Sequence, residues 1–74
     1  MPEVPVRPCE LVTVANVGDA DAVVTVRTPA GAFLIELAAR DAVQFIATFE
    51  GAVAWDAVYT IHVSKVEITG CRVV

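Results

Sequence analysis

The segment that decides the fold comprises residues 29–56 and reads PAG (29–31), AFLIEL (32–37), AARD (38–41), AVQFIATF (42–49), EG (50–51) and AVAWD (52–56). In the second and fourth of these pieces, apolar side chains recur at every second position, which is the period of a half-buried strand. The fourth piece is also rich in β-branched and aromatic residues, which favour strands. The segment therefore predicts two strands separated by turns, followed by Trp55.

A helix over about residues 33–49 is the alternative. Apolar residues also recur at helical spacing from Leu34 onwards, and Glu36 and Arg40 would form an ion pair four positions apart on a helix. We predict an all-β fold, a single small antiparallel β-sandwich or barrel-like domain. An α+β fold with this helix remains the alternative.

The flanking segments read as further strands. Residues 10–17 and 23–28 are rich in Val and Thr and are separated by the turn-forming sequence GDAD (18–21). Residues 58–64 form a further run, in which apolar and polar residues alternate from residue 59 onwards. The alternation then shifts by one position, because Lys65 is polar and Val66 is apolar. This shift predicts a β-bulge or a turn near residues 64–65, after which the even-numbered residues, Val66 among them, would point inwards.

The N-terminal segment is distinct in composition, with prolines at positions 2, 5 and 8. Proline favours extended backbone and prevents a helix here. We therefore predict an extended Pro-rich arm over residues 1–8 and a single β domain over residues 9–74. The arm is either a frayed tail or a segment that lies along a neighbouring subunit, and the second reading makes these residues partner contacts: Pro2, Val4, Pro5, Val6 and Pro8.

Composition narrows the possible partners. The chain has 74 residues, 57% of them hydrophobic, and so small a domain has little interior in which to bury them. Some of this apolar surface is therefore expected to meet a partner. No apolar run approaches the roughly 20 residues needed to cross a bilayer, so no membrane partner is expected. The net charge of −4 and the scattered basic residues also predict no nucleic-acid partner.

The sequence predicts no catalytic, cofactor or metal site, and no enzyme. His62 is the one histidine and would lie on the polar face of a strand. Cys9, Cys71 and His62 supply at most three zinc ligands and include no CxxC pair. Two reduced, buried cysteines are the expectation for a cytoplasmic protein, and a disulfide worth about 4 kcal/mol is the alternative.

Two aliphatic residues are predicted to point outwards. If Phe33 and Phe45 face inwards, then their neighbours Leu34 and Ile46 face outwards. Exposed branched aliphatics on a small domain are typical of an oligomer interface. Trp55 is predicted to anchor either the core or such an interface.

Several pieces of the chain resemble tailed-phage virion structural β modules of the capsid decoration (cement), head-fibre or tail-fibre type. The pieces are VANVGDADAVVTV (14–26), TPAG (28–31), LAARDAVQFIA (37–47) and the approach from Gly51 to WDAV (55–58), which together cover roughly residues 12–58. This sequence departs from the pattern at Arg40-Asp41, where the turn often carries a glycine.

The resemblance implies a structural protein without an active site. Within it, the length and the lack of repeats favour a capsid decoration protein that binds the outside of the head and stabilises neighbouring major capsid subunits. The expected partners are the major capsid protein and further copies of the chain, as a homotrimer. The expected location is the capsid surface of a virion, after synthesis in the host cytoplasm. The alternatives are a tail, neck or fibre component, or a small cytoplasmic protein-binding domain.

Overall fold

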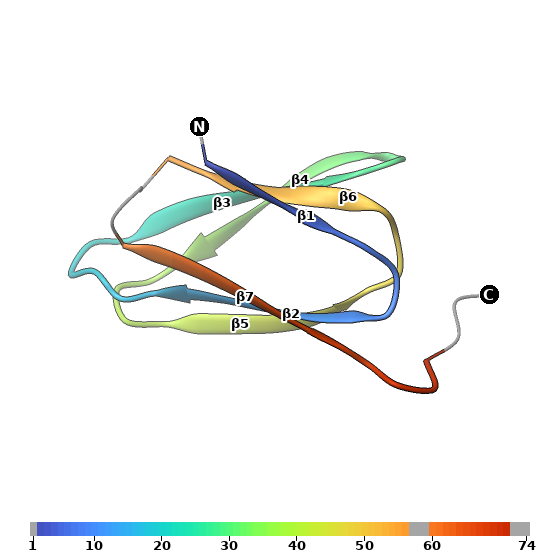
Figure 1. Cartoon of the computed structure of the whole chain (residues 1–74). Helices are drawn as coiled ribbons and strands as arrows, with labels where there is room; N and C mark the ends of the chain where they lie inside the picture. The colour runs from blue at the N-terminus through green and yellow to red at the C-terminus, as the bar shows by residue number, and fades with distance from the viewer. Residues whose placement is uncertain (1, 57–59, 72–74) are drawn as a thin grey trace.

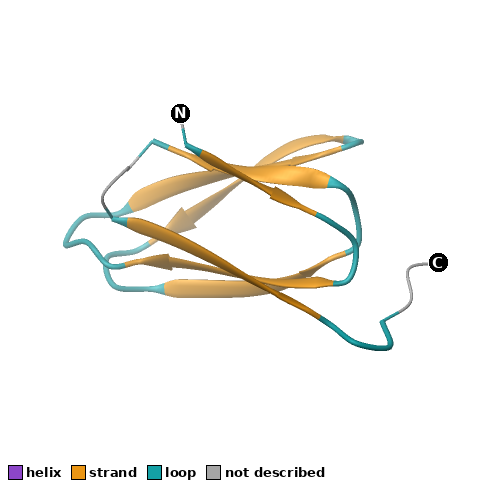
Figure 2. Ribbon diagram, viewed as in Figure 1, coloured by secondary structure: helices purple, strands orange, loops and turns teal. Residues whose placement is uncertain are grey.

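The structure is a computed structural model that describes residues 2–56 and 60–71. The described residues form seven strands, whose bounds are β1 Glu3–Val6, β2 Glu10–Asn16, β3 Ala22–Thr28, β4 Gly31–Leu37, β5 Ala42–Ala47, β6 Gly51–Trp55 and β7 Ile61–Glu67. They make two antiparallel sheets, in the orders β1-β6-β3-β4 and β5-β2-β7, which lie one over the other (Figure 1). Figure 2 shows that the described chain consists of strands and loops, without helix. The predicted all-β fold is confirmed, and the helix over about 33–49 is not formed.

The core lies between the two sheets and consists mostly of valine. In β3 the alternate residues Val24 and Val26 are fully buried, as the alternation in the sequence predicts. In β2, Val12 and Val14 do the same from the opposite sheet. The remaining buried apolar residues are Val6, Ala22, Leu37, Ala47, Val53, Ala54 and Ile61. Because valine is short and β-branched, it fills the space between two pleated sheets without large rotamer losses.

The turn at residues 38–41 carries the chain from one sheet to the other. The strand β4 pairs with β3, whereas β5 pairs with β2, so the two strands on either side of this turn do not form a hairpin. Within the turn, the N–H of Asp41 donates to the carbonyl of Ala38 at 3.1 Å. Arg40 has a φ of 63°, the left-handed conformation that favours glycine. This chain nevertheless has arginine at that position.

Residues 3–6 are extended, as predicted, but they belong to the domain. They form β1, which pairs with β6 over four residues and occupies the edge of its sheet. The N–H of Trp55 donates to the carbonyl of Pro2 at 3.1 Å, which continues this pairing. Pro5 is tolerated because an edge strand leaves one side of its backbone unpaired. The segment expected as a separate arm is thus an integral strand.

The predicted bulge near residues 64–65 is wrong. The strand β7 pairs with β2 in one continuous register from Asn16↔Ile61 to Glu10↔Glu67. Lys65 instead lies on the side of β7 that faces the other sheet, where its Nζ donates to the carbonyl of Pro5 at 2.6 Å. The same Nζ lies 3.7 Å from a carboxylate oxygen of Glu10. A long side chain can cover apolar surface and place its charge at the open side of the sandwich, so the register does not change. Residues 58 and 59, predicted as the start of this strand, lie outside the described residues.

Candidate functional site

The two cysteines form a disulfide, which corrects the expectation of reduced thiols. Cys9 follows β1, and Cys71 follows β7, and their Cα atoms are 5.5 Å apart. The N–H of Ile68 donates to the carbonyl of Cys9 at 2.9 Å and holds the two segments together beside the bond. The spacing of 62 residues gave no indication of this proximity, because it depends on the antiparallel pairing of β2 with β7, which places Cys9 beside Ile68.

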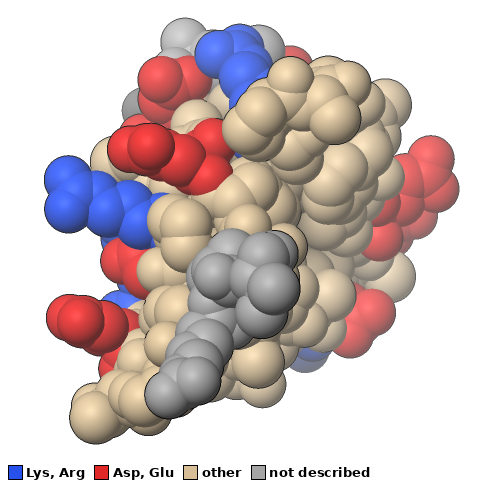
Figure 3. Space-filling view, turned by 90° about the vertical axis from the view of Figure 1, so that its right-hand side faces the viewer, with Lys and Arg blue, Asp and Glu red and all other residues tan. Residues whose placement is uncertain are grey.

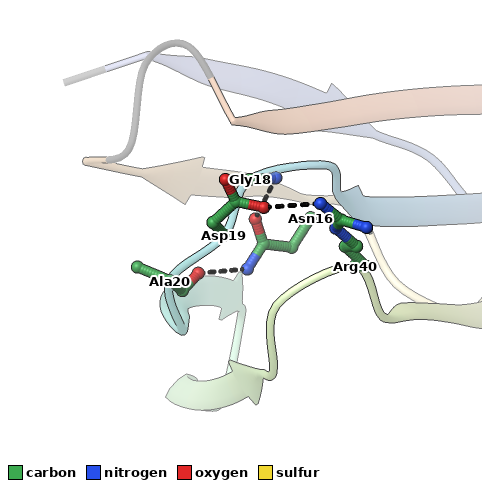
Figure 4. Close-up of polar contacts among 5 residues, drawn as sticks. All are labelled: Asn16, Gly18, Asp19, Ala20 and Arg40. Carbon is green, nitrogen blue, oxygen red and sulfur yellow. Dashed lines mark hydrogen bonds and ion pairs between the residues drawn. The ribbon is translucent and has the colours of Figure 1, made fainter.

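Asn16, a residue that the sequence analysis did not single out, makes several hydrogen bonds at the end of the sandwich opposite the disulfide. Its side chain is buried at the end of β2, and its Nδ2 donates to the carbonyls of Ala20 at 2.8 Å, Leu37 at 3.2 Å and Ala38 at 3.3 Å. Its Oδ1 accepts the N–H of Gly18 at 3.0 Å, as in an Asx turn (Figure 4). One amide group therefore fixes the loop after β2 and the turn after β4. The Asn-x-Gly sequence is the local signal that could have indicated this role.

The outer face of the β5-β2-β7 sheet is the candidate functional surface. Three side chains from each strand point outwards, because alternate residues of the register share one face. The hydrogen bond from Gln44 Nε2 to Thr13 Oγ1, at 3.0 Å, shows two of them side by side. We call this surface the uncharged face, and its residues are Leu11, Thr13, Ala15, Ala42, Gln44, Ile46, His62, Ser64 and Val66. None of the nine is Asp, Glu, Lys or Arg.

An apolar row crosses the uncharged face at one end. Leu11 lies directly opposite Ile46 on one neighbouring strand and Val66 on the other. The side chains of Ile46 and Val66 are 53% and 62% exposed. Neighbouring residues on one face of adjacent strands are in lateral contact, so the three side chains form one strip. Fully covering Ile46 and Val66 would contribute on the order of 1 kcal/mol each, since about half of each is still exposed.

The outer face of the other sheet differs in charge. It carries Glu3, Arg27 and Glu36, and an Arg27 nitrogen lies 3.2 Å from a carboxylate oxygen of Glu3. Acidic and basic side chains also alternate along one side of the end of the molecule that Figure 3 shows. The described charges of this acidic chain lie on the second sheet, in the loops and, for Glu10, Lys65 and Glu67, on the inward side of β2 and β7. Charged residues are therefore absent from the uncharged face although they are common on the rest of the described surface.

The structure separates the residues predicted as partner contacts. Ile46 lies on the uncharged face, whereas Leu34 is on β4 in the other sheet, where it is 67% exposed. Pro5 and Pro8 are exposed.

The other predicted contacts are less accessible. Pro2 and Val4 are half-buried, and Val6 is fully buried in the core, so the prediction that Val6 contacts a partner is wrong. It fails because the segment joins the sheet as β1. Trp55 is half-buried against the core, and its buried Nε1 has no hydrogen-bond partner among the described residues.

Leu11 and Val66 are the residues of the apolar row that the sequence analysis missed. Val66 was assigned to the interior because the shift in alternation was read as a bulge. The shift in alternation at residues 65 and 66 also fits a strand in unbroken register whose Lys65 points inwards. Such a lysine is tolerated on the edge strand β7, where its ammonium group reaches the carbonyl of Pro5.

Two hollows on the described surface are lined in part by ionisable side chains, which are Asp21 and Glu36 in one and Arg7, Glu10 and Glu67 in the other. The larger, about 340 Å³, lies beside the first residues of β3 and the last of β4, and the smaller, about 190 Å³, lies beside the disulfide. Among residues 2–56 and 60–71, no three His, Cys, Asp or Glu side chains are grouped so as to hold a metal ion. No helix in these segments is long and apolar enough to span a membrane.

Comparison of the chain with protein-family models, curated proteins and solved structures finds no match.

Proposed function

We propose that this protein is a capsid decoration protein, which binds the major capsid protein on the outside of a phage head through the uncharged face. The observation that carries the proposal is the absence of charged residues from all nine positions of that face in a chain of net charge −4. The centres of protein interfaces are depleted of charged residues, because a charge that loses its water without gaining a partner is costly.

The chemistry of the face suits a protein partner. The apolar row of Leu11, Ile46 and Val66 offers surface that gains from burial, and the next row, Thr13, Gln44 and Ser64, offers hydrogen-bonding groups. All of these side chains stand on paired strands, so little backbone order is lost on binding. A decoration protein that stabilises neighbouring subunits needs such a rigid surface, because its contribution comes from buried area.

The disulfide supports a location outside a reducing cytosol. Disulfides persist in oxidising surroundings and are rare in cytosolic proteins. A particle that leaves its host meets such surroundings, whereas a cytoplasmic protein-binding domain does not. The disulfide therefore favours a virion component over the cytoplasmic alternative. The number of copies that bind to a capsid would then distinguish a decoration protein from a tail or neck component.

The test is co-sedimentation of the purified protein with expanded capsids that lack it, followed by counting of the bound copies. Saturation at a stoichiometry of the icosahedral lattice is expected. The variant Ile46→Lys should weaken binding at least about tenfold, because it places an unpaired charge within the apolar row of the interface. The matched control is Thr25→Lys, which adds the same charge to the outer face of the other sheet and should leave binding unchanged.

Two results would refute the proposal. The first is binding of only a few copies per particle, which would indicate a tail or neck component. The second is equal binding by wild type and Ile46→Lys, which would show that the uncharged face is not the contact. Deletion of residues 1–8 is unsuited to this test, because it removes β1 and the fully buried Val6 from the fold.

A further inference from the structure

The outer edge of β4 is open. The strand lies at the end of the order β1-β6-β3-β4, and no described strand pairs with its outer side. Every second residue of an edge strand directs its N–H and C=O groups away from the sheet, where they can pair with another strand. This edge is also apolar, with Phe33 48% exposed and Leu34 67% exposed. In seven residues, GAFLIEL, Glu36 is the one charged residue.

The opposite side of the sandwich is protected against strand addition. There β1 carries Pro5 and is flanked by Pro2 and Pro8, which cannot donate to a new partner. Its neighbour across the sandwich, β7, carries Lys65, whose Nζ is held by the carbonyl of Pro5. Proline and lysine at edges are the usual protection against unwanted pairing. The side with β4 has neither residue within the strand, although β4 is one of the longest strands.

The adjacent edge strand β5 lies on the same side as β4, because the four residues 38–41 connect the two (Figure 1). It is one residue shorter and its exposed aliphatic residue, Ile46, belongs to the uncharged face. Unlike β5, β4 presents exposed large apolar residues on both of its faces, since Phe33 lies on the side of the core and Leu34 on the outer side. It is therefore the strand that gains most from a partner.

A second copy of β4 complements this edge. In antiparallel pairing about a two-fold axis at Leu34, each Leu34 lies opposite the other, Phe33 lies opposite Ile35, and Ala32 lies opposite Glu36. The two glutamates are then kept apart, and each faces a small residue. On the side of the core, Ile35 of one copy covers the exposed Phe33 of the other. Pairing centred on Glu36 would instead place the two carboxylates directly opposite each other, which is unfavourable.

We propose that the chain forms a two-fold symmetric dimer through antiparallel pairing of β4 with β4 of a second copy. The four-stranded sheets of the two copies then join into one sheet of eight strands. The dimer replaces the homotrimer expected from the sequence. It is independent of capsid binding, since the uncharged face lies on the other sheet and remains free. It also uses Leu34, which the sequence analysis assigned to an interface.

Sedimentation equilibrium of the purified full chain, over about a hundredfold range of concentration, tests this proposal. Wild type should show a reversible monomer–dimer equilibrium. Leu34→Lys should lower the association constant at least about tenfold, because the axis places two lysines directly opposite each other. Ile46→Lys is the matched control, with similar exposure on the other sheet, and should dimerise like wild type. Far-UV circular dichroism should show the same fold for all three proteins.

A charge-reversal pair tests the register. Leu34→Lys and Leu34→Glu should each associate more weakly than wild type when alone, and their equimolar mixture should regain the dimer, because only an axis at residue 34 brings these two side chains together. A monomeric or trimeric wild type would overturn the proposal, as would loss of the dimer in Ile46→Lys but not in Leu34→Lys. Failure of the mixture to associate would overturn the Leu34-centred pairing. None of these measurements involves capsids, so the outcome is separate from that of the proposed function.

Discussion

Reduction of the Cys9–Cys71 disulfide should destabilise the domain strongly. The bond closes a loop with a sequence separation of 62 residues. Loop-closure entropy for that length gives a stabilisation of about 4 kcal/mol, through restriction of the unfolded chain. A chain of 74 residues has a total free energy of unfolding of about 4–11 kcal/mol at the usual value per residue. The bond therefore supplies a large fraction of the stability.

The assay is thermal unfolding followed by far-UV circular dichroism, with and without reductant. For a domain of this size, a loss of about 4 kcal/mol lowers the midpoint by roughly 15–30 °C. The double variant Cys9→Ser/Cys71→Ser should unfold at a similarly low midpoint and should not respond to reductant, which separates the loss of the bond from side effects of the reagent. A decrease of less than about 1 kcal/mol in both experiments would contradict the argument from loop length.

Three further substitutions test the local structure, each by chemical denaturation. Arg40→Gly should stabilise the protein by about 0.5–1 kcal/mol, because the left-handed conformation of residue 40 is costly for residues other than glycine. Arg40→Ala should not stabilise the protein, and a gain in stability there would contradict the explanation. Gly51→Ala should destabilise by about 1–3 kcal/mol, because the added Cβ would overlap the backbone carbonyl oxygen of Arg27, and an unchanged midpoint would show that the strands can separate at low cost. Asn16→Ala should cost about 2–4 kcal/mol, since it leaves buried backbone groups without their partner, and a loss below 1 kcal/mol would mean that water replaces the amide.

The strands that the sequence predicted well are those whose burial depends on local alternation. In β2 and β3 every second residue is buried, and the residue types alone indicate this. The pairing partner of β4 was not predictable in the same way. The turn AARD is compatible with a hairpin or with a crossing between sheets, and the choice depends on β3 and β2, which are distant in the chain. The local alternation of residue types therefore predicts where strands form, whereas contacts between distant segments determine which strands pair.

The candidate surface was only partly predictable for a similar reason. Ile46 was recognised because its neighbours on both sides point into the core. Val66 was not, because the rule that polar residues point outwards placed Lys65 on the wrong side of its strand. The carbonyl of Pro5 that accepts the ammonium group is 60 positions away in the chain. A single long-range hydrogen bond thus changes the assignment of the strand's faces.

The covalent link between Cys9 and Cys71 also determines how the domain responds to force. Tension applied across residues 2 and 71 passes from Cys9 to Cys71 through the sulfur atoms, so the chain between the two cysteines is shielded from it. Among the described strands, only β1 lies outside the closed loop, and such a pull can separate it from its neighbour β6. The extension available before a covalent bond is loaded is therefore that of one short strand and its flanking residues. For the proposed decoration protein, tension between residues 2 and 71 would therefore leave the chain between the two cysteines unstretched.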